Sequence, residues 1–419
     1  MVNLISISKA HETKPNILEL TDFCKGLAII GIFLYHFDSK LLVFGWQGVH
    51  VFFVLSGFGL AYSCLRQQEK LESDKINWRK WYVKRAQRIL PTYWLVCLAT
   101  GTVLLFQIAL NGSNLLKDSA KVIAQTALDI TLLRNLTWVT IFNYNGPLWF
   151  VSLIVALYLI FPLLYGLVSR DRSLKRIMLV LLGVALIEFI YRAISLYWLD
   201  GFPIGYINFA QICPAPIHPI DRIPNSAFFP FQKEMPFGIL PSRITEFTLG
   251  VIGAVLFFSN RERFNKTLLN YSGLLAGCVI WFIGSTLPCT GLIGWLPSDF
   301  IIALGLTLLL VNLGWLVKRQ SFFGFNHLFT RISQLGVLSF YPFLIHEFLI
   351  LRVFPVTEMQ KSPTFWVGSH WFSALLLELV VLGAVIVVTT FLSWLLMRFD
   401  KSKLPEILIQ RTVEKWLKV

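Results

Sequence analysis

The chain has 419 residues, of which 56% are hydrophobic and 14% are charged, and its formal net charge is +14. Soluble domains carry closer to a quarter charged residues, so this composition excludes an ordinary water-soluble protein and indicates a lipid-embedded one. The basic excess would suit nucleic acid only on a soluble surface, and its distribution along the chain indicates membrane topology instead.

Ten apolar stretches predict an all-α, polytopic membrane protein. Their lengths suit a hydrocarbon core of about 30 Å at a rise of about 1.5 Å per residue. A weaker stretch, 121–142, contains Asp129 and Arg134, and we expect it to lie at the outer interface rather than to cross. The predicted spans are residues 23–43, 47–65, 89–110, 148–168, 176–198, 243–258, 270–287, 299–317, 335–354 and 372–397.

The distribution of lysine and arginine predicts the orientation. Ten spans place both ends on one side, and with the N-terminus inside, 27 of the 37 Lys and Arg residues are cytoplasmic. Cytoplasmic loops carry this excess. We therefore predict a cell-membrane protein, most simply of a bacterial cytoplasmic membrane, with both termini cytoplasmic. The expected domains are an N-terminal segment, a transmembrane domain and a basic tail: 1–20, 21–397 and 398–419.

The six cysteines and a proline-rich loop give two further expectations. No C-x-x-C pair is present, so buried free thiols are favoured over metal ligands, with a disulfide between Cys213 and Cys289 as the alternative. We expect no metal site. The outer segment 199–242 contains eight prolines, a density that forbids a regular helix. It either caps the bundle at a substrate entrance or serves as a stiff connector.

The first span carries Lys25 and His36, eleven residues apart. At about 100° per residue they share one helical face, about 16 Å apart along the axis. Lys25 is then at the cytoplasmic interface and His36 deep in the membrane. A neutral imidazole there can accept a proton from a hydroxyl group. The alternative is a histidine that only packs against another helix.

Arg85 and Arg88 lie three residues apart at the cytoplasmic entrance of the third span. Guanidinium groups bind phosphate with two parallel hydrogen bonds, so a phosphorylated donor such as coenzyme A is the functional interpretation. Contact with anionic lipid headgroups is the alternative.

Later spans add further polar candidates. Trp149 and Ser152 begin the fourth span and are candidate donors to a developing oxyanion. Arg243 and Glu246, three residues apart, can form an ion pair in the sixth span, and His346 in the ninth lies at a depth similar to that of His36. Glu188 and Arg192 in the fifth span are expected to pair with each other.

Taken in order, these motifs resemble the acyltransferase 3 family. The matching features are Lys25 with His36, the second-span run G-W-Q-G-V-H-V-F-F-V-L-S-G-F, the arginine pair before Ile89-Leu90-Pro91, L-W-F-V-S near Trp149, the segment 243–250, and L-S-F-Y-P-F-L-I-H ending at His346. The resemblance covers residues 21 to about 397.

The resemblance implies a membrane-bound O-acyltransferase. Such a protein moves an acyl group, commonly acetyl, from cytoplasmic acyl-CoA to a hydroxyl of a glycan, lipid-linked sugar or similar envelope or secreted acceptor. Arg85 and Arg88 would hold the donor phosphates, His36 would be the general base or an acyl relay, and Lys25 would line the same path. The implied partners are acyl-CoA as co-substrate, the acceptor and membrane lipids, with no bound cofactor and no nucleic acid. About twenty residues follow the last span, so we expect a stand-alone form without an added esterase-like domain.

Two departures and two rival functions accompany this interpretation. Many relatives have an acidic residue where this chain has His50, and a glutamate where it has Val155 and Ala156. A secondary transporter of a sugar or lipid intermediate is the main alternative, although internal repeats typical of that class are not evident. A purely structural membrane protein is disfavoured by two deep histidines and a paired-arginine entrance.

Overall fold

The computed structural model describes residues 16–38, 42–72, 75–111, 114–136, 138–197, 238–319, 323–354 and 371–409. Within these ranges the chain forms helices joined by short turns and contains no strand, as predicted. The elements are α1 (Ile17–Phe37), η1 (Gly45–Gln47), α2 (Gly48–Leu71), α3 (Trp78–Asn111), α4 (Leu115–Ile130), η2 (Arg134–Leu136), α5 (Trp138–Ile141), α6 (Leu148–Ser169), α7 (Leu174–Tyr197), η3 (Leu240–Arg243), α10 (Ile244–Ser259), α11 (Arg261–Leu268), α12 (Tyr271–Thr286), η4 (Leu287–Thr290), α13 (Leu292–Arg319), α14 (Phe323–Leu338), α15 (Phe340–Phe348), η5 (Leu349–Val353), α18 (Trp371–Asp400) and α19 (Leu404–Ile409).

The ten predicted spans correspond to α1, α2, α3, α6, α7, α10, α12, α13, the α14–α15 pair and α18. Among the described residues, eight helices are long and apolar enough to cross a membrane, or nine if the bent pair forms one span. The protein is therefore a multi-pass membrane protein.

The first span differs from its prediction by several residues. Helix α1 begins at Ile17 rather than at residue 23, because the Asn16 side chain caps it by accepting from the Leu18 amide at 3.2 Å. Hydropathy alone excluded this first turn because it holds charged residues. Two of the charges in α1 neutralise each other, since Lys25 Nζ lies 3.2 Å from Asp22 Oδ1.

The ninth span is broken. Two helices replace the continuous stretch predicted over 335–354, and they meet at Ser339 with a bend of 76°. Pro342 explains the break, since it has no backbone N–H to continue the helix from α14 and is tolerated only in the first turn of α15. Ser339 Oγ donates to the Gly336 carbonyl at 2.7 Å and stabilises the turn. The bend aims α15 at α1.

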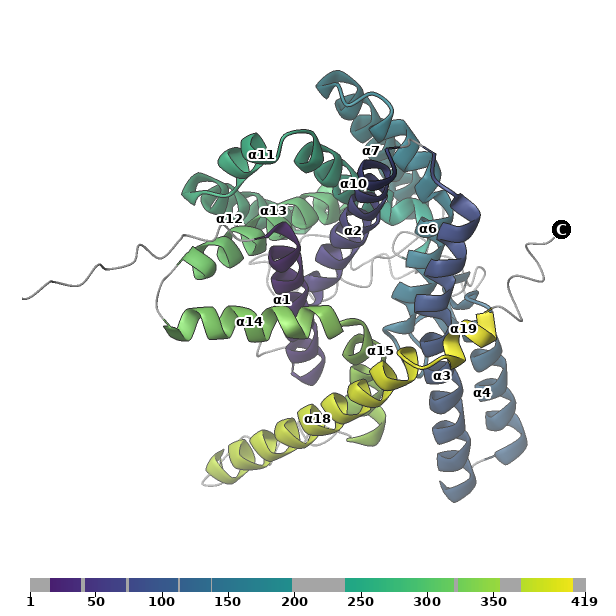
Figure 1. The fold of residues 1–419 in the computed structure, drawn as a ribbon. Helices are drawn as coiled ribbons and strands as arrows, with labels where there is room; N and C mark the ends of the chain where they lie inside the picture. The colour runs from purple at the N-terminus through teal and green to yellow at the C-terminus, as the bar shows by residue number, and fades with distance from the viewer. Residues whose placement is uncertain are drawn as a thin grey trace, which may run out of the picture.

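Helices α2 and α10 form the centre of the bundle (Figure 1). In each, 72% of the most apolar stretch is buried, against 11% for α18 at the edge. Gly57 and Gly250 let their backbones touch: a Cβ atom at Gly57 would overlap the Phe247 carbonyl, and one at Gly250 the Val54 carbonyl. Small residues permit this close approach between membrane helices.

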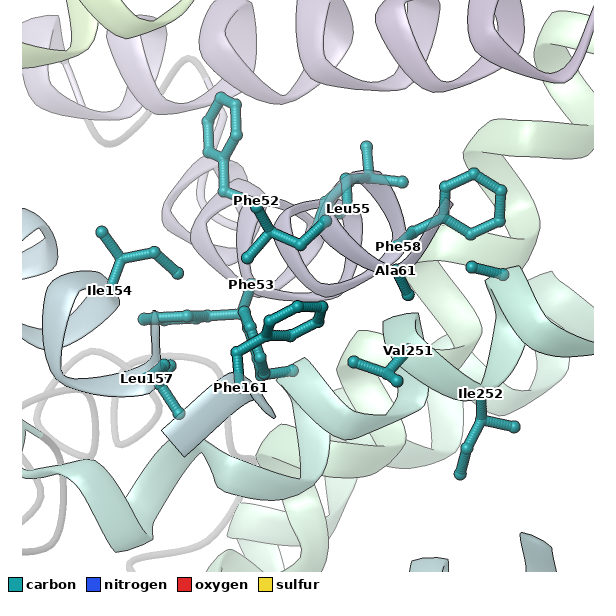
Figure 2. Close-up of a cluster of buried hydrophobic side chains, with 14 of the residues drawn as sticks. Phe52, Phe53, Leu55, Phe58, Ala61, Ile154, Leu157, Phe161, Val251 and Ile252 are labelled. Carbon is teal, nitrogen blue, oxygen red and sulfur yellow. The ribbon is translucent and has the colours of Figure 1, made fainter. Parts of the chain in front are cut away.

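A continuous apolar core surrounds α2 (Figure 2). Phe53 packs with Leu157 and Phe161 of α6, and Val251 of α10 lies nearby. None of these four side chains has exposed surface. Phe52 projects from a different side of α2, toward the site described below. The core thus holds α2, α6 and α10 in a fixed mutual arrangement.

The weak stretch 121–142 is not one helix. Helix α4 ends at Ile130 and packs along α3, and the chain continues through η2 and α5. Arg134 and Asp129 are buried inside the protein, with Arg134 Nη1 3.4 Å from Asp129 Oδ1. Arg134 also donates to the Asn143 carbonyl at 3.0 Å. Hydropathy does not predict this burial, because it cannot show that the two charged side chains are paired with each other.

The cysteine expectation holds in part. Cys24, Cys64 and Cys97 are buried free thiols, whereas Cys278 is free but exposed. Cys289 is disulfide-bonded, so its prediction as a free thiol is wrong. Cys213 lies outside the described residues, and so do residues 199–237 of the proline-rich segment. The same is true of residues 1–15 of the N-terminal segment and 410–419 of the basic tail.

Candidate active site

A basic pocket opens where α1, α2, α3 and α6 meet the bend between α14 and α15. Its volume is about 180 Å³, and its charged lining residues are Lys25, Arg85 and Arg88. Among the described residues that line it there is no carboxylate. Three cations predicted from two separate motifs are therefore gathered in one cavity.

One arginine of this basic pocket, Arg85, is held against an aromatic ring. The Arg85 guanidinium lies 5.6 Å from the centroid of the Trp81 ring, and Trp81 stacks on Phe161 with centroids 5.0 Å apart. Cation–π contact of this kind orients a guanidinium without neutralising it. The pocket is consequently suited to an anion, and its paired arginines to phosphate oxygens.

His36 and His346 form a second feature of the site. They lie 310 positions apart in sequence, yet His346 Nε2 is 3.2 Å from His36 Nδ1. His346 has no exposed surface, whereas the His36 side chain is 24% exposed. The bend at Ser339 produces this meeting, because it turns α15 toward the C-terminal part of α1.

The hydrogen-bond partners assign the protons on these rings. His346 Nδ1 lies 3.0 Å from the Pro342 and Phe343 carbonyls, and a carbonyl only accepts, so this nitrogen carries hydrogen. In a neutral ring, His346 Nε2 then accepts from His36 Nδ1, which also lies 2.9 Å from the Ile32 carbonyl. His36 Nε2 is left with a lone pair, as a general base requires.

Glu347 faces that nitrogen. Its Oε2 is 3.6 Å from His36 Nε2, and its side chain is 17% exposed. The carboxylate packs against Gly146, where a Cβ atom would overlap it. The loop before α6 is anchored to α15 by Asn145, which donates to the Leu344 carbonyl at 3.0 Å. Glu347 can therefore stabilise the imidazolium that forms when His36 accepts a proton.

A phenylalanine wall, composed of Phe52, Phe150 and Phe343, belongs to the lining of the basic pocket and contacts His346 through Phe343. All three rings line the pocket. Their centroids are 5.0 to 6.2 Å apart, and the centroid of Phe343 is 5.9 Å from that of His346. The two halves of the site are thus adjacent, because Phe343 lines the pocket and also contacts His346.

Arg243 and Glu246 belong to a different, buried charge cluster. The predicted ion pair is present, with Arg243 Nη1 2.6 Å from Glu246 Oε1. Asp299 Oδ2 lies 2.7 Å from Arg243 Nη1 and 2.8 Å from Arg192 Nη2, so it bridges the two arginines. His50 also belongs to this cluster, because its Nδ1 is 3.2 Å from Glu246 Oε1 and its side chain is 1% exposed.

The predicted pair of Glu188 with Arg192 is also present, at 3.0 Å. It is not self-contained, because Arg192 also donates to Asp299. This cluster joins α2, α7, α10 and α13 through buried ion pairs. Such an arrangement is typical of groups that stabilise a fold.

The two candidate oxyanion donors occupy buried positions beside the wall. Trp149 and Ser152 flank Phe150 in α6 and are each 6% exposed. In the described lining of the basic pocket, Phe150 is present but neither of these two residues is. Trp149 packs against Phe53 and Phe142.

Sequence reasoning gave no role to Glu347 or Asp299. Glu347 directly follows His346, and a second ionisable group in an apolar run was a usable signal. Asp299 stands at the start of a predicted span, where a carboxylate can equally reach water. Its two arginine partners come from other helices and could not be identified from local sequence.

Comparison with known proteins adds a family match. The model of the acyltransferase 3 family, described as an acyltransferase domain, matches residues 21–398. The O-acetyltransferase OatA of Staphylococcus aureus strain NCTC 8325 is 26% identical over 177 residues, which are 42% of this chain and 29% of that protein. A provisionally named O-acetyltransferase of S. aureus strain COL is 24% identical over 177 residues, 40% of this chain and 28% of that protein.

The chain therefore covers less than a third of the length of either relative. No solved structure gives a significant match to the chain.

Proposed function

The chain belongs to the acyltransferase 3 family, and from that premise we propose that it is a membrane-bound O-acetyltransferase. In this proposal the donor is cytoplasmic acetyl-CoA, and the acceptor is a hydroxyl group of a glycan, lipid-linked sugar or similar envelope or secreted molecule. The proposed location is the cell membrane, with both termini in the cytoplasm.

One observation carries the proposal: a pocket with three cations in its lining shares Phe343 with His346, and His346 lies within hydrogen-bond distance of His36. A phosphorylated thioester needs an anion site for its phosphates and a base near its carbonyl. Lys25 and His36 lie on one face of α1, about 16 Å apart along its axis. The donor would extend along that face from the arginines toward His36.

The chemistry then follows from the assigned protons. His36 Nε2 accepts the acceptor's hydroxyl proton while the hydroxyl oxygen attacks the thioester carbonyl. The new C–O bond forms, the C–S bond breaks, and the imidazolium returns its proton to the departing thiolate. Glu347 stabilises the imidazolium between these two steps, and His346 holds the ring through Nδ1. The low-polarity surroundings strengthen both interactions.

Topology supports the sidedness of this transfer. The prediction of 27 cytoplasmic cations places Arg85 and Arg88 at the inner surface, where acyl-CoA is available. The disulfide at Cys289 agrees with an outer location for the α12–α13 turn, since disulfides persist in oxidising compartments. The names of the two S. aureus relatives support acetyl as the transferred group.

The test is transfer of radiolabelled acetyl from acetyl-CoA to acceptors extracted from the source membrane. His36→Ala should lower the rate by about 10²–10⁴-fold, the usual contribution of a positioned base. His327→Ala is the matched control, because His327 is exposed on α14 and is not among the described residues that line the basic pocket. A wild-type rate in purified His36→Ala would contradict the proposal. Loss of the acetyl group from one class of envelope glycan in a deletion strain would identify the acceptor.

A further inference from the structure

The phenylalanine wall bounds the space available to the donor's acyl group. Phe52, Phe150 and Phe343 come from α2, α6 and α15, and they are 9%, 8% and 4% exposed. Each ring contacts the other two. Rings that interlock in this way within a packed helical core have little freedom to move aside.

The wall also occupies a specific place along the donor's path. Phe343 lines the basic pocket with Arg85 and Arg88 and also contacts His346. A thioester anchored by its phosphates at the arginines, and directed toward the histidines, brings its acyl group to these rings. The pocket measures about 180 Å³, below the range of roughly 300–1,000 Å³ typical of small-molecule sites. The pocket as a whole therefore has little unoccupied volume.

We propose that Phe343, supported by Phe52 and Phe150, determines the acyl-chain length that the enzyme accepts and restricts it to the shortest acyl groups. This inference rests on the proposed acyl-CoA-dependent function. An acetyl group has one carbon beyond the carbonyl and fits against the ring faces. Every further methylene must displace a ring that is held by two others, and overpacking of this kind is destabilising.

The wild-type enzyme provides the first test. Rates of transfer from acetyl-, propionyl-, butyryl- and hexanoyl-CoA are compared as kcat/KM. We expect a fall of roughly tenfold or more for each added methylene, because one misfitting methylene in an apolar pocket changes kcat/KM by about 10–200-fold. Equal rates with acetyl-CoA and hexanoyl-CoA would overturn the inference while leaving the proposed function intact. Absence of transfer from every acyl-CoA would instead overturn the proposed function.

Variants at the wall provide the second test. In Phe343→Ala and Phe343→Leu the ratio of butyryl to acetyl kcat/KM should rise at least tenfold, more in the alanine variant, because its side chain leaves more space. Phe53→Leu is the matched control: Phe53 packs on Phe150 with centroids 4.8 Å apart, but it is not among the described lining residues of the pocket. Its ratio should stay within twofold of wild type.

Three outcomes would refute the role of Phe343. One is an unchanged ratio in both variants, and another is an equal rise in Phe53→Leu. The third is loss of transfer with every donor although coenzyme A still raises the melting temperature, since a residue that only bounds the acyl group is not required for chemistry. If Phe343→Ala does not fold, Phe343→Leu and the wild-type chain-length profile decide the question.

Discussion

Glu347→Gln removes the negative charge next to His36 while keeping the shape and one acceptor oxygen of the side chain. The distance from Glu347 Oε2 to His36 Nε2 is 3.6 Å. Coulomb's law with an effective dielectric constant of about 20 gives about 4.6 kcal/mol for a carboxylate and an imidazolium at this separation. Both side chains are less than a third exposed, at 24% and 17%, so solvent reduces this energy only in part. We expect a loss of about 3–4 kcal/mol, or roughly a hundredfold to a thousandfold in kcat.

The assay separates this effect from a loss of structure. Initial rates of acetyl transfer are measured over a range of acetyl-CoA concentrations, and kcat should fall while KM for the donor stays within about twofold, because Glu347 is not among the described residues lining the basic pocket. Glu69→Gln, an exposed carboxylate on α2, is the matched control. A kcat within threefold of wild type, or a change confined to KM, would refute the proposed role of Glu347.

Three other substitutions test donor binding, the buried charges and the central helix contact. Coenzyme A at a hundred times its dissociation constant should stabilise the wild-type protein by about 2.7 kcal/mol and raise its melting temperature. Arg85→Ala should abolish this rise. No rise in the wild-type protein would favour a transporter. Asp299→Asn should lower the free energy of unfolding in detergent by about 3–5 kcal/mol, because it weakens contacts to two buried arginines. The control Asp118→Asn, in an exposed ion pair with Lys121, should lower it by less than about 1 kcal/mol. Gly57→Ala should destabilise the protein by more than about 2 kcal/mol, because the added Cβ atom overlaps the backbone of α10. The control Gly59→Ala, whose Cβ atom meets nothing within 4 Å, should be neutral or slightly stabilising. Equal effects of the two substitutions would refute the packing argument.

The apolar runs and the order of the motifs were sufficient to predict a helical membrane protein of this family. Composition alone excluded a soluble fold, and nine of the ten predicted spans appear as single helices. The placement of Lys25 and His36 on one face follows from helical periodicity, which does not depend on neighbouring helices. The arginine pair was recognisable for the same reason, since residues three apart on a helix project together.

Errors arose where polar residues meet partners that are distant in sequence. Hydropathy placed the start of α1 too late because it penalised a first turn whose cap and ion pair offset the charges. It also treated residues 335–354 as one span, since their composition is apolar on both sides of the bend. His50 could not be placed, because its surroundings are supplied by Glu246 and Arg243 from another helix.

The sequence by itself determined that the protein is helical and which residues share a face of a span, because these properties depend on side-chain polarity and a fixed helical repeat. Only the tertiary structure decided which faces meet. The contact of His36 with His346, the approach of Glu347 and the three rings that line the pocket with the arginines all join helices far apart in the chain. Such contacts depend on how the bundle packs and on the bend at Ser339, and no local pattern specifies them.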